Sequence, residues 1–271
     1  SHFDTKFKDN WKFNANFSYQ NLKSDNFRRV KDLLGANYAN NLDAYGDNLP
    51  YDVDAADTKV YVGDRTQYSY ILNKNTYAIN LSTEIDLPRW NVVASIFSSY
   101  SESYRDGQFR NHYYLNSSKG KSDVYNTTDA GMKAKVTYKI DGKNFLVYTG
   151  AFFTLAPTLN EIFVNPRTTN LITPEIQNMQ INSNELSYII RGQVLKLRLS
   201  GYYTTIQKAT EFSRYYFDIS GGTTDEGNAL AAEILTNLNK TYKGLELGAE
   251  VKVTPTLSVT AVGSYGDYTV A

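Results

Sequence analysis

The stretch "WKFNANFSYQ", residues 11–20, alternates apolar and polar side chains without a break. Successive side chains of a β-strand point to opposite sides, so this stretch predicts a strand with one apolar and one polar face. A soluble sandwich would bury the apolar face in its core. A membrane barrel would turn it to lipid and line a lumen with the other. The apolar face carries Trp11, Phe13, Ala15, Phe17 and Tyr19.

The same alternation recurs along the chain and predicts a large antiparallel sheet. No apolar run approaches the roughly 18 residues that a membrane helix needs. Membrane-spanning strands would not appear as such a run, because their apolar residues alternate with polar ones. Aromatic residues are abundant, with 23 Tyr and 13 Phe, and they suit strands and membrane interfaces. The further predicted strands lie at 75–87, 90–100, 132–140, 195–204, 245–253 and 257–265.

The connections between these strands alternate between short and long. Asp, Gly and Pro in the short ones suit tight hairpins, whereas repeated loops above about 15 residues are unusual in soluble domains. Outer-membrane barrels combine short periplasmic turns with long external loops, so the asymmetry favours a barrel over a sandwich. Within the last long segment, "ALAAEILTNL" (229–238) has helical spacing and predicts a short helix. The short turns are 88–89, 141–143, 191–193 and 254–256; the long segments lie near 21–67, 105–126, 154–177 and 207–238.

Aromatic residues also mark both ends of the predicted strands. The eight steps from Trp11 to Tyr19 cover roughly 26 Å at ~3.3 Å per residue, which suits a tilted strand crossing an apolar band of ~25 Å. Tryptophans follow short turns and tyrosines stand near the long segments, as interfacial girdles require. The residues expected to face lipid or its interfaces are Trp11, Phe13, Phe17, Tyr19, Trp90 and Tyr203.

Composition argues against several other kinds of protein. The 28 basic and 28 acidic residues give a formal net charge of zero, unlike the basic excess of a nucleic-acid binder. The absence of Cys excludes disulfides, thiolate metal sites and a Cys nucleophile. We therefore expect no nucleic-acid partner.

Few side chains suit catalysis or metal binding. The two histidines, His2 and His112, cannot form a multi-His zinc site, and exposed loop histidines are the expectation. The acidic run "DVDAAD" (52–57) could offer oxygens to Ca²⁺, but it lacks the glycine and spacing of a calcium loop. The Gly-rich 220–227 follows no strand-to-helix pattern, which favours a loop tip over a phosphate site. We expect a protein that is not an enzyme, with no cofactor and no metal.

Aromatic side chains in the long segments are the binding candidates. Rings stack on sugars and flat ligands, and external loops are where receptors capture their substrates. The alternative is that these rings only pack one loop against another. The candidates are Tyr113, Tyr114, Phe212, Tyr215, Tyr216 and Phe217.

Several segments, in order, resemble the TonB-dependent receptors of the Gram-negative outer membrane. The resemblance is closest to the branch with an N-terminal carboxypeptidase-regulatory-like domain, and it covers more than half of the chain. The matching segments are "YRDGQFRN" (104–111), "KGKSDVY" (119–125), "GMKAKVTYKIDGKNF" (131–145), "LAPTLNEIFVNPRTTNLITPE" (155–175), "SYIIRGQVLKLRLSGYYTT" (187–205) and "YKGLELGAEVKVTPTLSVTAVGSYGDYT" (242–269).

The resemblance implies an all-β, transmembrane, up-and-down antiparallel barrel of 22 strands, closed internally by a plug domain. The chain carries about ten strands, so residues 1–271 are expected to be an internal portion of the barrel, without plug, N-terminus or C-terminal strands. The implied partners are outer-membrane lipid, the protein's own plug, the TonB system, and a surface lipoprotein or other subunits of an outer-membrane complex.

Three functions remain open at this level. The first is energy-coupled import of a bulky nutrient of the glycan, peptide or siderophore class across the outer membrane. The second is a transport-inactive barrel that acts as a scaffold subunit of an outer-membrane complex. The third is a soluble secreted β-sandwich that acts as a binding module.

Overall fold

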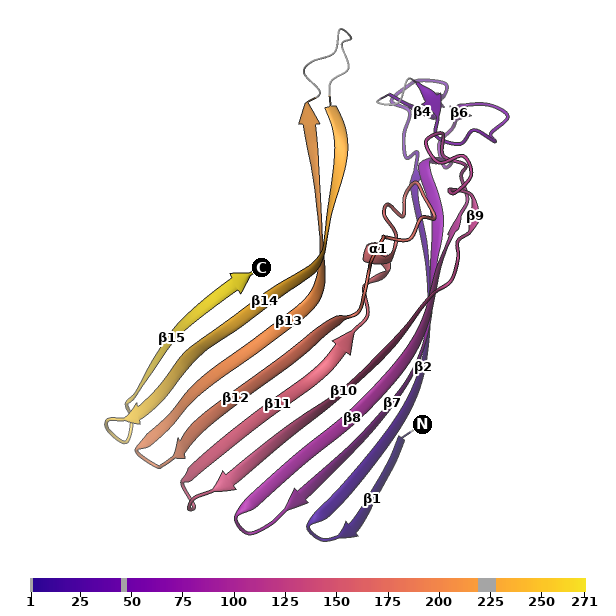
Figure 1. The fold of residues 1–271 in the computed structure, drawn as a ribbon. Helices are drawn as coiled ribbons and strands as arrows, with labels where there is room; N and C mark the ends of the chain where they lie inside the picture. Colours follow the sequence, from indigo (N-terminus) through magenta and orange to yellow (C-terminus); the bar gives the residue numbers. More distant parts are fainter. Residues whose placement is uncertain (1, 45–47, 219–227) are drawn as a thin grey trace.

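Ten long strands run up and down in one antiparallel sheet, each paired with its neighbour (Figure 1). The computed structural model describes residues 2–44, 48–218 and 228–271. The order in the sheet follows the order in the chain, as the sequence predicted for an up-and-down fold. The strands are β1 (His2–Lys8), β2 (Trp11–Arg29), β7 (Arg65–Asp86), β8 (Trp90–Gly107), β10 (Tyr125–Lys139), β11 (Asn144–Leu155), β12 (Met179–Arg191), β13 (Leu195–Asp218), β14 (Asn228–Lys252) and β15 (Ser258–Val270).

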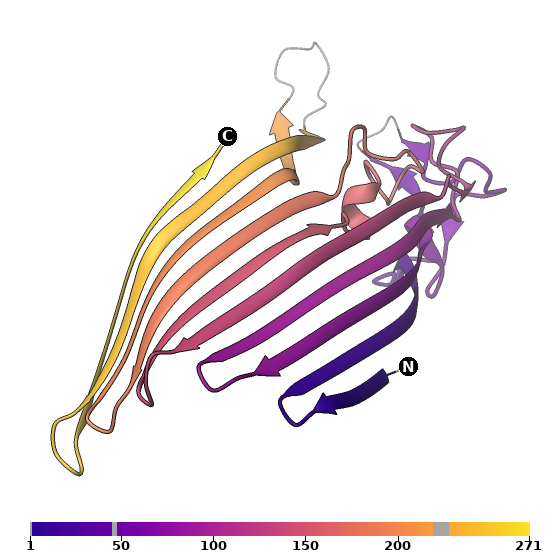
Figure 2. The ribbon, with the colours of Figure 1, turned by 60° about the horizontal axis from the view of Figure 1, so that its bottom comes forward.

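The smaller elements all lie at one end of the sheet, among the long connections (Figure 1). Within the described ranges no helix is long and apolar enough to cross a membrane. The sheet is curved (Figure 2) and open, because β1 and β15 each pair on one side only. The smaller elements are β3 (Ala39–Asn40), β4 (Leu42–Asp43), β5 (Leu49–Pro50), β6 (Lys59–Val60), β9 (Gly120–Lys121) and α1 (Leu159–Ile162).

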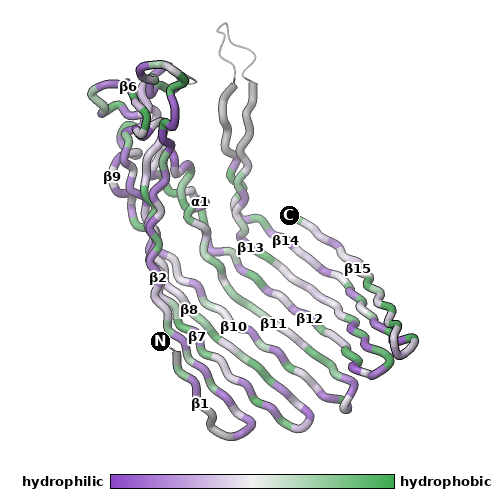
Figure 3. The backbone as a smooth tube through the Cα atoms, turned by 180° about the vertical axis from the view of Figure 1, so that it is seen from behind, coloured by the Kyte–Doolittle hydropathy of each residue, from purple (hydrophilic) through white to green (hydrophobic). Residues whose placement is uncertain are grey.

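The register places the apolar residues of successive strands on one face. Directly paired residues of antiparallel strands share a face. Phe17 therefore shares its face with Ile79, and the row beside it runs from Leu81 through Ile96 to Met132. Figure 3 shows hydrophobic and hydrophilic residues alternating along the strands. The alternation read from residues 11–20 thus describes the whole sheet, and we call these surfaces the apolar face and the polar face.

The apolar face is not the core of a sandwich. Phe17 and Ile96 are 50% and 56% exposed, and no second sheet covers them in the described part of the chain. The buried apolar cluster lies elsewhere: Tyr70, Leu72, Ile162 and Phe163 pack together where the segment containing α1 reaches the outer end of the sheet. Leu72 pairs with Arg105, and both belong to the polar face. The core therefore joins a loop to the polar face.

Two predictions about the long segments are wrong. The strands continue far into them: β13 and β14 pair from Ile206 and Lys240 out to Asp218 and Asn228. The predicted helix at 229–238 is part of β14. Its helical spacing is a weak local preference, and the backbone hydrogen bonds offered by β13 outweigh it. Register shifts near Ala209 mark where this hairpin bends away from the sheet (Figure 1).

Candidate functional site

Three outer segments interlock at one end of the strands. They are residues 41–60 (of which 41–44 and 48–60 are described), 105–123 and 158–176, and we call them the outer-loop assembly. The first joins the second through the backbone bond from Val53 N to Arg110 O, at 3.0 Å. The second joins the third through side chains, for example the Ser117 and Thr169 hydroxyls at 3.3 Å. These hydrogen bonds therefore join the three segments to one another. The outer-loop assembly is a surface whose loops are already fixed in place.

Asp54 connects the first two segments. Its carboxylate accepts from Arg110 Nε at 3.1 Å and from Lys119 Nζ at 2.6 Å. The hydrogen bond from Lys119, followed by that from Arg110, lowers the pKa of Asp54. Asp52 accepts from the backbone N–H groups of Arg110 and Asp54, at 3.0 and 3.2 Å. The acidic run at 52–57 is thus engaged by cationic and N–H donors, as an internal tie between loops.

Arg105 connects the second and third segments and is only 1% exposed. Its Nε donates to Pro166 O at 2.6 Å, and one terminal nitrogen donates to Ser118 O at 2.7 Å and to the side chain of Asn170. The guanidinium also lies over the Tyr70 ring, 5.3 Å from its centroid. Burial lowers the pKa of Arg105 to about 10, so the side chain stays cationic at neutral pH.

His112 is buried, which contradicts the expectation of an exposed loop histidine. Its side chain is 3% exposed, Nδ1 lies 3.2 Å from Pro50 O, and Nε2 lies 3.4 Å from Asp43 Oδ2. Tyr51 donates to the other oxygen of Asp43 at 3.2 Å. Burial, then the Asp43 carboxylate, raises the pKa of Tyr51 to about 12. No pattern in the sequence predicts this cluster, because its residues meet only in the folded chain. The pairing of β4 with β5 brings Asp43 close to Tyr51.

Tyr51 makes the stability of the outer-loop assembly depend on alkaline pH. The ordinary pKa of a tyrosine side chain is 10.0, whereas the pKa of Tyr51 is about 12, so the folded form holds the proton more tightly. The contribution is complete below about pH 10 and is lost as the pH rises through about 12. The tyrosinate absorbance of the wild type minus that of Tyr51→Phe should therefore titrate near pH 12. A difference curve centred near pH 10 would contradict the placement of this side chain.

The polar face carries a hydrogen-bonded network of side chains. Glu185 accepts from Arg198 at 2.5 Å and from Ser187 at 2.6 Å, and Ser187 lies 2.9 Å from Ser200. The hydrogen bonds that Ser187 and Arg198 donate to Glu185 offset the free energy needed to desolvate its carboxylate. Across the sheet, Lys12 bonds Glu84 at 3.1 Å. The face is thus polar and largely charge-balanced, which suits water or a polar partner.

The structure separates the six binding candidates into two groups. Tyr113 and Tyr114 belong to the outer-loop assembly, and Tyr113 is 59% exposed with its ring 4.1 Å from that of His112. Phe212 is in the outer part of β13, where it pairs with Ile234. The backbones of Tyr215, Tyr216 and Phe217 continue that strand, and their side chains lie outside the described part of the structure. Figures 1 and 3 show this hairpin standing apart from the assembly, so the six do not form one site.

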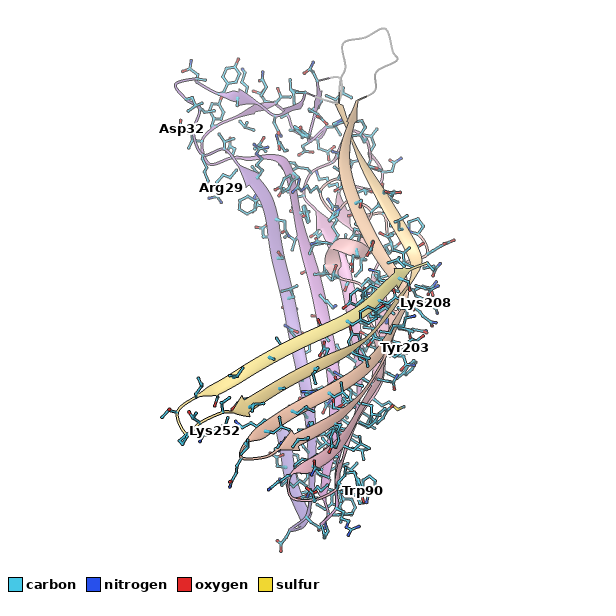
Figure 4. All side chains as sticks on the ribbon, turned by 90° about the vertical axis from the view of Figure 1, so that its left-hand side faces the viewer. Arg29, Asp32, Trp90, Tyr203, Lys208 and Lys252 are labelled. Carbon is cyan, nitrogen blue, oxygen red and sulfur yellow. The ribbon has the colours of Figure 1, made fainter. Side chains whose placement is uncertain are left out.

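The predicted lipid-facing set shares the apolar face. Cross-strand pairs link its members to like residues: Tyr19 with Tyr77, Tyr77 with Tyr100, and Trp90 with Tyr138. In Figure 4 the labelled Trp90 and Tyr203 lie on the same side of the bowed sheet. That this face meets lipid stays a prediction. The set is Trp11, Phe13, Phe17, Tyr19, Trp90 and Tyr203.

Two further features of the sequence concern metal and phosphate binding. In the part of the chain that the structure describes, no three or more His, Cys, Asp or Glu side chains are grouped to hold a metal ion. The Gly-rich segment at 220–227 lies outside the described residues.

Comparison with known proteins places the fold. No family model and no curated protein matches the chain. Among solved structures it is similar to the copper transporter OprC, with TM-score 0.66, 13% identity, 98% of this chain and 36% of that chain covered. The FrpB iron transporter from Neisseria meningitidis (F3-3 variant) follows with TM-score 0.58, 9% identity, and 99% and 34% coverage. For the ferric-catecholate import receptor Fiu from E. coli K12 the values are 0.56, 13%, 96% and 35%.

This likeness is one of shape. By name, these structures are two metal transporters and an import receptor, and such proteins are what the sequence resemblance indicated. The chain spans about a third of the length of each. Its fold is therefore that of a section of a transporter β-barrel.

Proposed function

We propose that this chain is a section of the barrel of a TonB-dependent transporter in the outer membrane of a Gram-negative bacterium. The observation that carries the proposal is the two-faced sheet: an exposed apolar face over ten strands, a polar face behind it, and long loops at one end only. The transporter fold of the similar structures supports the same assignment.

Further strands are part of the proposal. Lipid offers no partner for unpaired strand edges, so β1 and β15 require neighbours within a closed barrel. The family resemblance supplies the expected total of 22 strands and an internal plug, which the polar face would surround. Outer-membrane lipid, the plug and the TonB system are the partners proposed on this basis. A surface lipoprotein or another complex subunit would meet the loops.

The proposed activity is energy-coupled import of a bulky nutrient of the glycan, peptide or siderophore class. Large solutes exceed what passive pores admit, so capture at the loops must be coupled to movement of the plug. A transport-inactive scaffold is the second candidate, and it shares every feature of the barrel. The sequence of the plug separates the two, because a TonB box favours transport and a degenerate plug favours a scaffold.

The membrane assignment is tested on the full-length protein. A folded outer-membrane barrel requires detergent and migrates differently on a gel before and after heating. Uptake of glycans, peptides and siderophores is then compared between the wild type, a deletion strain and a strain lacking TonB. Loss of uptake of one class in both mutants supports transport. A protein that is soluble without detergent overturns the membrane assignment.

Tyr113 and Tyr114 are proposed as contacts of the imported solute. Replacing both by alanine should weaken solute binding by roughly 5- to 150-fold, since each aromatic contact contributes about 0.5–1.5 kcal/mol. The measurement is the solute concentration at which uptake is half-maximal, after the uptake of the deletion strain is subtracted. Tyr265→Ala is the matched control, because Tyr265 is 77% exposed on the apolar face. Equal losses in both variants would remove the two tyrosines from the binding site.

A further inference from the structure

An open groove with basic walls lies beside the outer ends of β2 and β7. Its volume is about 910 Å³, and its lining includes Arg28, Arg29, Lys31, Val60 and Tyr68. Val60 is 8% exposed and forms part of an apolar floor. Figure 4 shows Arg29 at the outer end of the strands, on the opposite side of the molecule from Tyr203. The groove therefore lies at the loop end of the sheet.

The cationic groups of this groove have no carboxylate partner among the described residues. The ion pairs found there use Arg65, Arg110 and Lys119, but not Arg28, Arg29 or Lys31. Arg28 bonds the neutral Gln67 side chain at 2.5 Å. Asp32 is the one acidic residue in the lining, and it accepts from Leu34 N at 2.9 Å. The lining thus carries three cations against one anion.

Aromatic and aliphatic groups stand between these cations. The Arg29 guanidinium lies 5.1 Å from the centroid of Phe27, and both residues line the groove. From the third outer segment, Arg167 lies over Tyr68 at 4.9 Å. Leu34 also lines the groove and is 94% exposed. Guanidinium groups bind carboxylate, phosphate and sulfonate through paired N–H donors, while the apolar surfaces cover an uncharged part of the same ligand.

We propose that this basic groove is a binding site for the imported solute, and that the solute is an anion with an apolar or aromatic part. The inference rests on the transport function proposed above and adds a substrate class to it. Charge complementarity selects the anion, and the apolar floor excludes small, fully hydrated inorganic ions as good ligands. Tyr68 and Arg167 connect the groove to the outer-loop assembly, so capture there would place the solute at the mouth of the barrel.

The test uses purified full-length protein in a neutral maltoside detergent and the probe 8-hydroxypyrene-1,3,6-trisulfonate, a water-soluble aromatic anion. Fluorescence anisotropy measures its binding at low and high salt. The test variant is Arg28→Gln/Arg29→Gln/Lys31→Gln. The control, Arg89→Gln/Lys143→Gln/Lys252→Gln, removes the same charge from the opposite end of the strands, in or next to the short turns. Heat-modifiable gel mobility confirms that both variants remain folded.

Saturable binding by the wild type is expected, weakened roughly tenfold or more in the groove variant and by salt, and unchanged in the control. No saturable binding by the wild type, or equal affinity in both variants, overturns the inference. These two results concern only the groove. The transport proposal stands if the same protein keeps its heat-modifiable barrel and its TonB-dependent uptake. Loss of those two properties removes the transport proposal independently of the probe.

Discussion

Replacing Ile96 by arginine is expected to destabilise the barrel in a lipid bilayer by about 2–4 kcal/mol. Ile96 lies midway along the spanning part of β8, is 56% exposed on the apolar face, and pairs with Leu81 and Met132. A charge there would stand in the centre of the lipid, where neither water nor a counter-charge can solvate it. The measurement is denaturant unfolding of the full-length protein from lipid vesicles.

Two controls distinguish the effect of the arginine's depth in the membrane from the effect of the face of the sheet that carries it. Tyr100→Arg places the same charge on the apolar face near the outer interface and should cost about 0–1 kcal/mol. Asn80→Arg changes the polar face, where Asn80 pairs with Asn16 and Phe97, and should cost less than Ile96→Arg. If Asn80→Arg were the more damaging change, the faces would be assigned the wrong way round.

Replacing Arg105 by alanine should release the third outer segment. The change removes donors to Pro166 O, Ser118 O and Asn170, and leaves buried oxygens without partners. A hydrogen bond to a charged group contributes about 1.5–3 kcal/mol, and the three bonds share one guanidinium, so their contributions do not add in full. The loss of local stability should therefore be on the order of 3 kcal/mol. Amides of residues 158–176 should then exchange hydrogen roughly 100-fold faster.

The control for this prediction is Arg110→Ala. Arg110 also joins two outer segments, but its ion pair with Asp54 is exposed and should contribute at most about 1 kcal/mol. Arg105→Lys keeps the charge and loses the planar fork of donors, so it should fall between the wild type and Arg105→Ala. Equal exchange in Arg105→Ala and Arg110→Ala would show that burial of Arg105 adds nothing.

These two predictions concern parts of the molecule that are stabilised by different interactions. The strands are expected to gain their stability from lipid on the apolar face, and the outer-loop assembly gains it from buried hydrogen bonds such as those of Arg105. The basic groove lies at the boundary between the two. A solute bound there would meet loops that are already ordered, so little conformational entropy would oppose binding.

The sequence by itself determined the parts of this protein that depend on neighbouring residues. The period-2 alternation in "WKFNANFSYQ" and its repeats predicted strands with one apolar and one polar face, and the family resemblance implied their up-and-down order. The structure confirms the strands, their two-faced pattern and their order. Side-chain direction alternates at every residue of a strand, so that information is local. The same holds for the short turns, where Asp, Gly and Pro set the backbone locally.

Only the tertiary structure decided where the strands end and how the loops meet. Residues 229–238 have helical spacing, yet they form β14 because β13 supplies hydrogen-bond partners that local sequence cannot reveal. The sequence did not predict the burial of Arg105 and His112, since their partners are remote in sequence and meet them only in the folded chain. The candidate groove was missed for the same reason: β2, β6 and β7 bring together residues that are far apart in sequence. Periodicity is a property of the chain, whereas long-range contacts exist only after folding.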